Sequence, residues 1–203
     1  PPEAGSQLAT DPVRQRVVAV KSGPTGYVAE WDGSQWGGTL NTLPPFLTEY
    51  PGFAALAYEG NGRVLLTAPG GYSHRYDGTS WNFVRYDSAA GGVLATDTRR
   101  QRVVSLSGRT WEWNGNNSQF TLEWHDGAWN FVRSTRHPNA RWGYSLAFDT
   151  RRGRTMLFGG SSNSGGHDEL WEWDGSDWTL RSSASRPPAR DNGALTYDTA
   201  RGE

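Results

Sequence analysis

One short segment recurs along the chain, and this repeat constrains the fold more than any other feature. The clearest copies read LATDPVRQRVV from Leu8 and LATDTRRQRVV from Leu94. Further copies begin at Leu56, Leu146 and Leu195, so successive leucines are 48, 38, 52 and 49 residues apart. A period of this size indicates a repeat architecture in which each repeat forms one supersecondary unit.

A second marker follows later in each unit. It is an Asp-Gly pair with a tryptophan two or three residues further on, and its copies begin at Asp32, Asp77, Asp126 and Asp174. These aspartates are 45, 49 and 48 residues apart, close to the period of the leucine marker. Two unrelated markers that share one period define four successive units.

Each unit is predicted to contain four short strands. In the fourth unit the strands are expected at 144–149, 154–158, 170–173 and 178–181, with a tight charged turn at 150–153. The pair Asp174-Gly175 is a hairpin signal between the last two strands. Only 35% of the residues are hydrophobic but 13% are aromatic, which suits a sheet core built from large rings. Four-stranded units at this spacing predict propeller blades.

The combined pattern of the fourth unit resembles that of bacterial kelch repeats. It is carried by Arg141, Gly143, Leu146, Phe148, Asp149, Gly153, Arg154, Phe158, Gly159, Gly160, 170–175 and Trp178. The resemblance implies an all-β, kelch-type β-propeller with four four-stranded blades plus the first strand of a fifth, as part of a larger ring. The expected blades are 1–46, 47–87, 88–138 with an insertion, and 139–187; residues 188–203 are expected to begin a further blade.

The resemblance also implies where a partner binds, because in kelch propellers the second-to-third strand loops and the connections between blades emerge on one face. Exposed residues that do not repeat between units are the better candidates there. These candidates are Tyr72, Arg109, Trp111, Arg141, Trp142, Arg190 and Asn192. Arg141 and Arg190 also fit a structural role, since arginine is common before the glycine of the first strand. Residues 109–121 form an insertion that is expected to lengthen one such loop.

Repeated residues are expected to serve the fold instead. The tryptophans that begin the fourth strands, Trp36, Trp81, Trp129 and Trp178, are predicted to pack between blades, because repeat cores are built from repeated residues. The Asp-x-x-Arg turns, such as Asp11 with Arg14 and Asp97 with Arg100, are expected to be charged hairpin tips with local ion pairs. Each ion pair would contribute about 0–1 kcal/mol if it is exposed.

Several kinds of chemistry are excluded or disfavoured. The chain has no cysteine, which removes disulfides, thiolate nucleophiles and the cysteine-dependent copper site of galactose oxidase-like kelch proteins. A net charge of −1 gives no basis for binding nucleic acid, and no apolar run is long enough for membrane insertion. The four histidines lack ligand spacing, so no cofactor is predicted. Calcium in the polar loops 114–119 and 161–168 stays open, although their oxygen ligands lack a regular spacing.

The sequence therefore predicts a non-catalytic binding scaffold that presents loops to a protein or glycan partner, outside a bacterial cell or on its surface. Two alternatives stay open. One is an accessory or catalytic propeller of a carbohydrate-active enzyme, which would require a matched carboxylate pair. The other is an architectural subunit that self-associates, or joins further blades of the same ring, through open strand edges.

Overall fold

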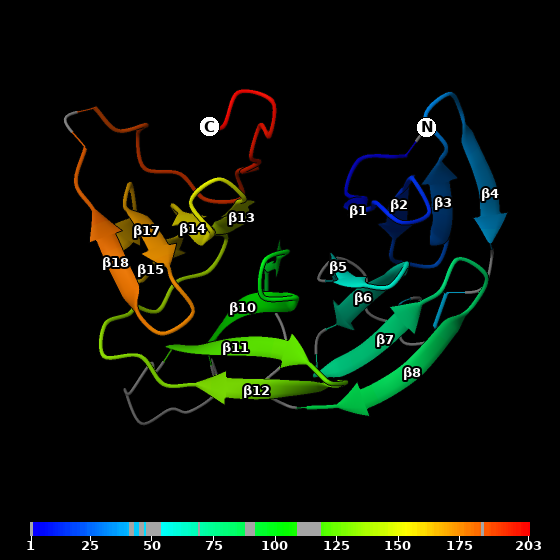
Figure 1. Ribbon diagram of the computed structural model, residues 1–203, viewed down its shortest axis with the longest axis horizontal. Helices are drawn as coiled ribbons and strands as arrows, with labels where there is room; N and C mark the ends of the chain where they lie inside the picture. Colours follow the sequence, from blue (N-terminus) through cyan, green and yellow to red (C-terminus); the bar gives the residue numbers. More distant parts are fainter. Residues whose placement is uncertain are drawn as a thin grey trace. The chain divides into compact units, whose positions relative to one another are not determined.

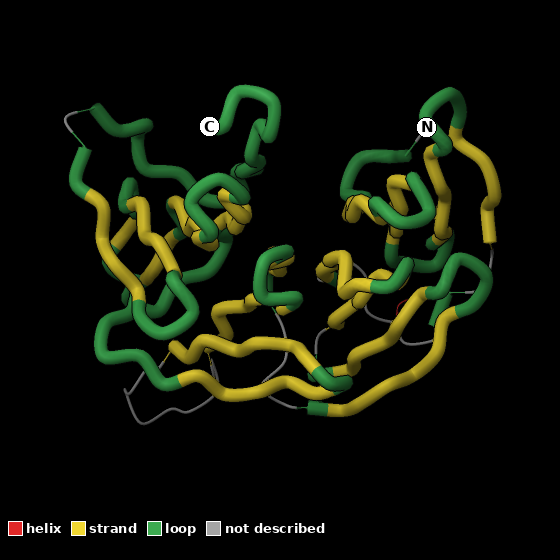
Figure 2. Tube along the Cα trace, in the orientation of Figure 1, coloured by secondary structure: helices red, strands yellow, loops and turns green. Residues whose placement is uncertain are grey.

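The computed structural model describes residues 2–40, 43–44, 47, 54–68, 70–87, 92–108, 119–183 and 185–203. Its main elements are four antiparallel sheets of four strands each (Figures 1 and 2). The first sheet contains β1 (Gln7–Asp11), β2 (Arg16–Lys21), β3 (Tyr27–Trp31) and β4 (Trp36–Leu40). The second contains β5 (Ala55–Gly60), β6 (Arg63–Ala68), β7 (Tyr72–Tyr76) and β8 (Trp81–Tyr86).

The third sheet contains β9 (Leu94–Asp97), β10 (Arg102–Gly108), β11 (Gln119–His125) and β12 (Ala128–Val132). The fourth contains β13 (Ser145–Asp149), β14 (Arg154–Phe158), β17 (Leu170–Trp173) and β18 (Trp178–Arg181). The short strands β15 (Ser161–Ser162) and β16 (Gly165–Gly166) form a separate hairpin. In every large sheet the strands pair in chain order, which confirms the predicted all-β fold of four propeller-type blades.

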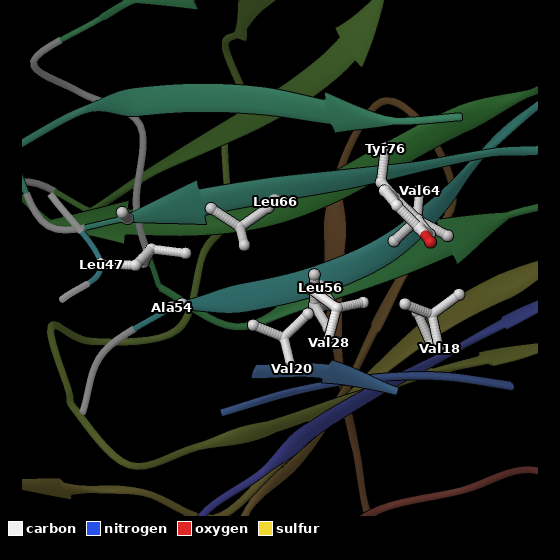
Figure 3. Packing of buried hydrophobic residues seen from close by; sticks show 11 residues of the cluster. Val18, Val20, Val28, Leu47, Ala54, Leu56, Val64, Leu66 and Tyr76 are labelled. Carbon is white, nitrogen blue, oxygen red and sulfur yellow. The ribbon is translucent and has the colours of Figure 1, made fainter. Parts of the chain in front are cut away.

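The chain forms two compact units, of which the first comprises residues 1–92 with 126–128 and the second residues 93–125 with 129–203. In the first unit the core lies between the first two sheets. Val18, Val20 and Val28 of the first sheet point toward Leu56 and Leu66 of the second (Figure 3). Strand β6 is buried over most of its length and β2 over Val18, Ala19 and Val20, as their apolar runs require.

The core of the second unit lies between the third and fourth sheets in the same way. Val104 and Leu106 from β10 join Leu146, Leu157 and Trp173 from the fourth sheet in one buried cluster. The equivalent composition of the two cores follows from the repeat, because equivalent strand positions carry equivalent apolar residues.

The Asp-Gly turns position one aromatic pair in each blade. The rings pair across the third and fourth strands as Trp31–Trp36, Tyr76–Trp81, Trp124–Trp129 and Trp173–Trp178, with centroids 4.9–5.7 Å apart. In the second unit these rings also contact the neighbouring blade. The indole Nε1 of Trp178 donates to Oγ1 of Thr121 at 2.8 Å, and that of Trp173 donates to Oε1 of Glu123 at 2.9 Å. The predicted packing of Trp178 between blades is confirmed.

The Asp-x-x-Arg turns form the predicted local ion pairs, and in the first and third blades the carboxylate of the pair is buried. Asp11 is completely buried, and its Oδ1 accepts the backbone N–H groups of Val13 and Arg14. The guanidinium of Arg14 folds back over the turn, with Nε 2.6 Å from Oδ2 of Asp11 and Nη1 2.5 Å from Oε1 of Glu30. It also lies over the ring of Tyr76 in the second blade, 5.4 Å from the centroid. The turn therefore belongs to the interface between two blades.

The third blade repeats this ion cluster, which consists of the turn aspartate, its arginine and a glutamate on the third strand. Arg100 binds Asp97 at 2.6 Å and Glu123 at 2.7 Å, and both carboxylates are buried. The arginine lies against the Asp-Gly turn of the fourth blade, where a β-carbon at Gly175 would be 2.6 Å from its Nη1. Two features therefore favour glycine at position 175, namely its positive φ of 102° and the close approach of the Arg100 side chain.

The other two blades vary the cluster. In the second blade the charges exchange places, since Glu59 near the end of β5 is the acid and pairs with Arg75 on β7. In the fourth blade Asp149 is buried and pairs with Arg152, whose side chain is 63% exposed. The glutamate of the third strand, Glu172, pairs with Arg181 and not with Arg152.

Residues 188–203, predicted to start a further blade, form the turn of that motif without a strand ladder. Oδ1 of Asp198 accepts the N–H groups of Ala200 at 2.9 Å and Arg201 at 3.1 Å, as the other turn aspartates do. Within the described residues no strand pairs with residues 194–197, and Asp198 exchanges two backbone hydrogen bonds with Glu203, with N–O distances of 2.6 and 3.3 Å. A β-strand requires backbone hydrogen bonds to a neighbouring strand, so the hydrogen bonds within the turn do not by themselves produce one.

We expect Arg100→Ala to lower the free energy of unfolding by about 3 kcal/mol, the low end of the range for breaking a buried ion pair, because Arg100 is partly exposed. The loss arises because Asp97 and Glu123 stay buried without their cation. Urea denaturation followed by tryptophan fluorescence measures it. The matched control is Arg152→Ala, whose exposed ion pair should contribute less than about 1 kcal/mol. Equal losses in the two variants would contradict an interface role for the cluster.

Candidate functional site

Four of the seven predicted site residues lie together in the fourth blade. Arg141, Trp142 and Arg190 contact the connection between β14 and β17, residues 159–169, and Asn192 is hydrogen-bonded to Gly143, which follows Trp142. Tyr72 lies apart from them, at the start of β7 in the first unit. Arg109 and Trp111, with most of the predicted insertion, lie outside the described residues; the described end of the insertion, 119–121, extends β11. We call residues 159–169 with Arg141, Trp142 and 190–192 the blade-4 loop cluster.

The connection between β14 and β17 is a structured hairpin. Its strands pair Ser161 with Gly166 and Ser162 with Gly165. Before it, Gly159 and Gly160 have φ angles of 73° and 95°, and a β-carbon on Gly160 would be 3.0 Å from the carbonyl oxygen of Trp142. The Gly-Gly pair is therefore needed for its backbone conformation and for this close approach.

Backbone hydrogen bonds hold both neighbouring loops to this hairpin. Trp142 and Ser161 exchange two bonds, with N–O distances of 2.9 and 2.8 Å. On the other side, the N–H of Gly160 donates to the carbonyl of Arg190 at 2.9 Å, and the N–H of Asn192 donates to the carbonyl of Gly143 at 2.7 Å. The loops before and after the fourth blade are thus fixed to its own hairpin.

Arg141 is the internal support of the cluster. Its side chain is completely buried, with Nη2 2.6 Å from Oε2 of Glu169 and Nη1 3.2 Å from the carbonyl oxygen of Gly159. Its Nε donates to the carbonyl of Asn139 at 2.9 Å. A buried guanidinium with these partners has no surface to offer a ligand, so the geometry favours the structural role that the sequence left open.

Trp142, Arg190 and Asn192 have the exposure that a binding residue needs. The Trp142 side chain is 53% exposed although its backbone is fixed to Ser161. Arg190 is exposed, and its Nε donates to the carbonyl of Pro188 at 3.2 Å. Asn192 is exposed with a φ of 51°, a left-handed conformation that asparagine tolerates better than most residues.

Glu169 was not predicted from the sequence. Its carboxylate accepts hydrogen bonds from Arg141 and from the indole of Trp171 at 3.1 Å. Burial alone would raise the pKa of Glu169, but these two donors outweigh it and hold the pKa below its usual value. A comparison of the repeats does mark position 169 as unusual. In the other blades the equivalent position, four residues before the last aromatic ring of the third strand, is itself aromatic, namely Tyr27, Tyr72 and Phe120.

His167 and Ser162 form a hydrogen-bonded pair, with Nε2 and Oγ 3.0 Å apart. Burial lowers the pKa of His167, so its imidazole is neutral at neutral pH. A nucleophilic serine also needs a group that orients its base. The nearest carboxylate oxygen, Oε2 of Glu169, is 4.0 Å from Nδ1 of His167, beyond hydrogen-bonding distance, and is already bound by Arg141. The pair lacks the third member of a catalytic triad.

The described part of the chain contains neither a metal-binding cluster nor a membrane-spanning helix. Within it, no three His, Cys, Asp or Glu side chains gather closely enough to hold a metal ion. Residues 114–118 of one loop considered for calcium lie outside that part. None of the described helical segments is long and apolar enough to cross a bilayer.

Comparison with known proteins supports the fold. No protein-family model and no curated protein matches the chain. Among solved structures the chain is similar to that of YjhT, with a TM-score of 0.66 over 96% of this chain and 70% of the other. The two share a propeller-type fold. Their sequences are 13% identical, so the likeness extends to the fold and no further.

We expect Arg141→Ala to destabilise the protein by about 3 kcal/mol, because it leaves the partly buried Glu169 carboxylate without its cation. Hydrogen exchange should then accelerate at the amides of residues 160–167. The control is Arg190→Ala, which removes an exposed side chain and should change stability by less than about 0.5 kcal/mol. Unchanged exchange in Arg141→Ala would mean that the ion pair does not support the hairpin.

Proposed function

We propose that this chain is a bacterial kelch-type propeller that acts as a non-catalytic binding module outside the cell, and that its blade-4 loop cluster contacts a protein or glycan partner. The observation that carries the proposal is Trp142, a large aromatic side chain that is 53% exposed on a fixed backbone. The corresponding residue before the next first strand is Asp191, so the repeat itself does not require a tryptophan there.

The support for binding is energetic. A tryptophan offers a large contact area while only two side-chain torsions need to be ordered, which is why the residue is frequent at binding hot spots. Here the two backbone bonds to Ser161 have already fixed the main chain. A partner that covers Trp142 would therefore gain apolar contact without ordering a loop.

The carboxylate in the cluster argues for binding over catalysis. Glycoside hydrolysis requires one carboxylic acid with a raised pKa beside a second, ionised carboxylate. Glu169 has the opposite property, because Arg141 and Trp171 stabilise its ionised form and lower its pKa. Such a group is a poor proton donor at neutral pH.

The decisive experiment is a screen of the purified chain against an array of bacterial and plant glycans, followed by calorimetric titration of any glycan that binds. Trp142→Ala should weaken binding at least about tenfold, a change of about 1.4 kcal/mol. Phe131→Ala is the control, since Phe131 is a similarly exposed aromatic residue outside the cluster.

Two results would contradict this proposal. Unchanged affinity in Trp142→Ala would remove the cluster from the binding site. Release of reducing ends from a bound glycan would favour the alternative of a carbohydrate-active enzyme.

A further inference from the structure

The outer half of the second blade carries three consecutive pairs of rings across β7 and β8. They are Tyr76–Trp81 with centroids 4.9 Å apart, His74–Phe83 at 5.3 Å and Tyr72–Tyr86 at 5.3 Å. The pairs follow the strand register, so they form one row on one face of the sheet. We call this row the aromatic ladder. It lies at the free edge of the sheet, since β8 is the last strand (Figure 1).

The ladder runs from the core to solvent. Tyr76 and His74 are buried, and Tyr76 belongs to the core cluster of the first unit. Beyond them Tyr72 is 40% exposed, Phe83 59% and Tyr86 56%. The buried end fixes the position of the row, while the outer three rings offer a contiguous apolar surface of the kind that marks interaction sites.

A β-bulge places these rings on one face. Phe83 and Tyr86 are three residues apart, and in a regular strand they would point to opposite faces. The register shifts between Ser73 and His74, so that His74 faces Phe83 while Ser73 faces Arg85, and Val84 is the extra residue. Bulges commonly redirect side chains beside functional sites. Here the bulge brings Tyr86 opposite Tyr72.

The fold does not require the complete ladder. In the fourth sheet the equivalent of the second pair is Trp171 opposite Leu180, and Glu169 occupies the position of Tyr72. In the first sheet β4 reads WGGTL, which supplies no ring beyond Trp36. The third sheet has one ring pair beyond Trp124–Trp129, namely Phe120–Phe131 with centroids 4.3 Å apart. The number of outer ring pairs therefore differs between the blades, and among the described residues the second blade carries the longest row.

The absence of charged groups among the rings of the ladder indicates the class of its ligand. Burial lowers the pKa of His74 to about 4, so the imidazole is neutral near neutral pH, and the other five rings of the ladder carry no charge there. Tyr72 and Tyr86 add phenolic hydroxyls to the exposed end. Flat apolar faces with hydroxyl groups at their rim match a pyranose, which has a C–H face and equatorial hydroxyls. An anionic or cationic ligand would find no countercharge on the ladder.

We propose that the aromatic ladder binds a neutral oligosaccharide, with sugar rings stacked on Tyr72, Phe83 and Tyr86. This site is separate from the blade-4 loop cluster and does not depend on Trp142. A row of rings along a strand favours a chain of sugars over a single one, because successive rings on one face are about 6.5–7 Å apart.

The test is calorimetric titration of the purified chain with cellohexaose, xylohexaose and mannohexaose, and with an oligogalacturonate as the charged comparison. At least one neutral hexasaccharide should bind with a dissociation constant below about 1 mM. Tyr86→Ala and Tyr72→Ala should each weaken that binding at least about fivefold, whereas Tyr86→Phe, which keeps the ring, should retain most of it. The affinity should be the same at pH 6.5 and pH 8, because His74 is neutral at both.

Two controls separate this site from the other. Trp142→Ala should leave the affinity of the hexasaccharide unchanged, and so should Phe131→Ala, an exposed ring of the third sheet. Deletion of Val84 should abolish binding while circular dichroism shows a folded protein, because it removes the bulge that aligns Tyr86.

The proposal is overturned if no neutral hexasaccharide binds below about 5 mM, or if only the oligogalacturonate binds. It is also overturned if Tyr86→Ala binds as the unaltered protein does. Loss of binding in Trp142→Ala alone would assign the sugar to the blade-4 loop cluster. That outcome would sustain the proposed function and reject the ladder.

Discussion

The packing of these blades depends on a buried carboxylate at the end of the first strand of a blade. Asp11 and Asp97 lose their contacts with water there. Each carboxylate accepts hydrogen bonds from turn N–H groups and from one arginine instead. That arginine must lie where the next blade begins, since it also reaches a glutamate and the following Asp-Gly turn. The requirement to neutralise a buried charge therefore fixes the spacing of neighbouring sheets.

The same requirement explains why polar and aromatic residues repeat together. A carboxylate on the third strand, Glu123, accepts hydrogen bonds from an indole of the next blade as well as from Arg100. The tryptophan is thus both a core ring and a hydrogen-bond donor. In a chain with few aliphatic residues, this double use lets Trp173 and Trp178 fill an interface while their indole N–H groups are hydrogen-bonded.

The two proposed binding surfaces lie where the blades differ from one another. Glu169 stands where the other blades have an aromatic residue, and it anchors Arg141 beneath the exposed Trp142. The second blade departs in another way, with a bulge and extra rings on its outer strands. A shared scaffold with local departures is the usual way in which repeat proteins acquire binding sites, because the strands supply rigidity and the variable residues supply chemistry.

The sequence by itself determined that the chain contains four blades, because two markers recur with a shared spacing of 38–52 residues. It also determined the four strands of each blade and the identity of the turns, because these follow from strand alternation and from local turn signals. It also placed Trp142, Arg190 and Asn192 in connecting loops. Only the tertiary structure decided that Arg141 is buried, that Asp11 is an interface residue and not an exposed tip, and that Tyr72 faces Tyr86. Burial and register depend on which segment lies opposite, and a repeat pattern does not carry that information.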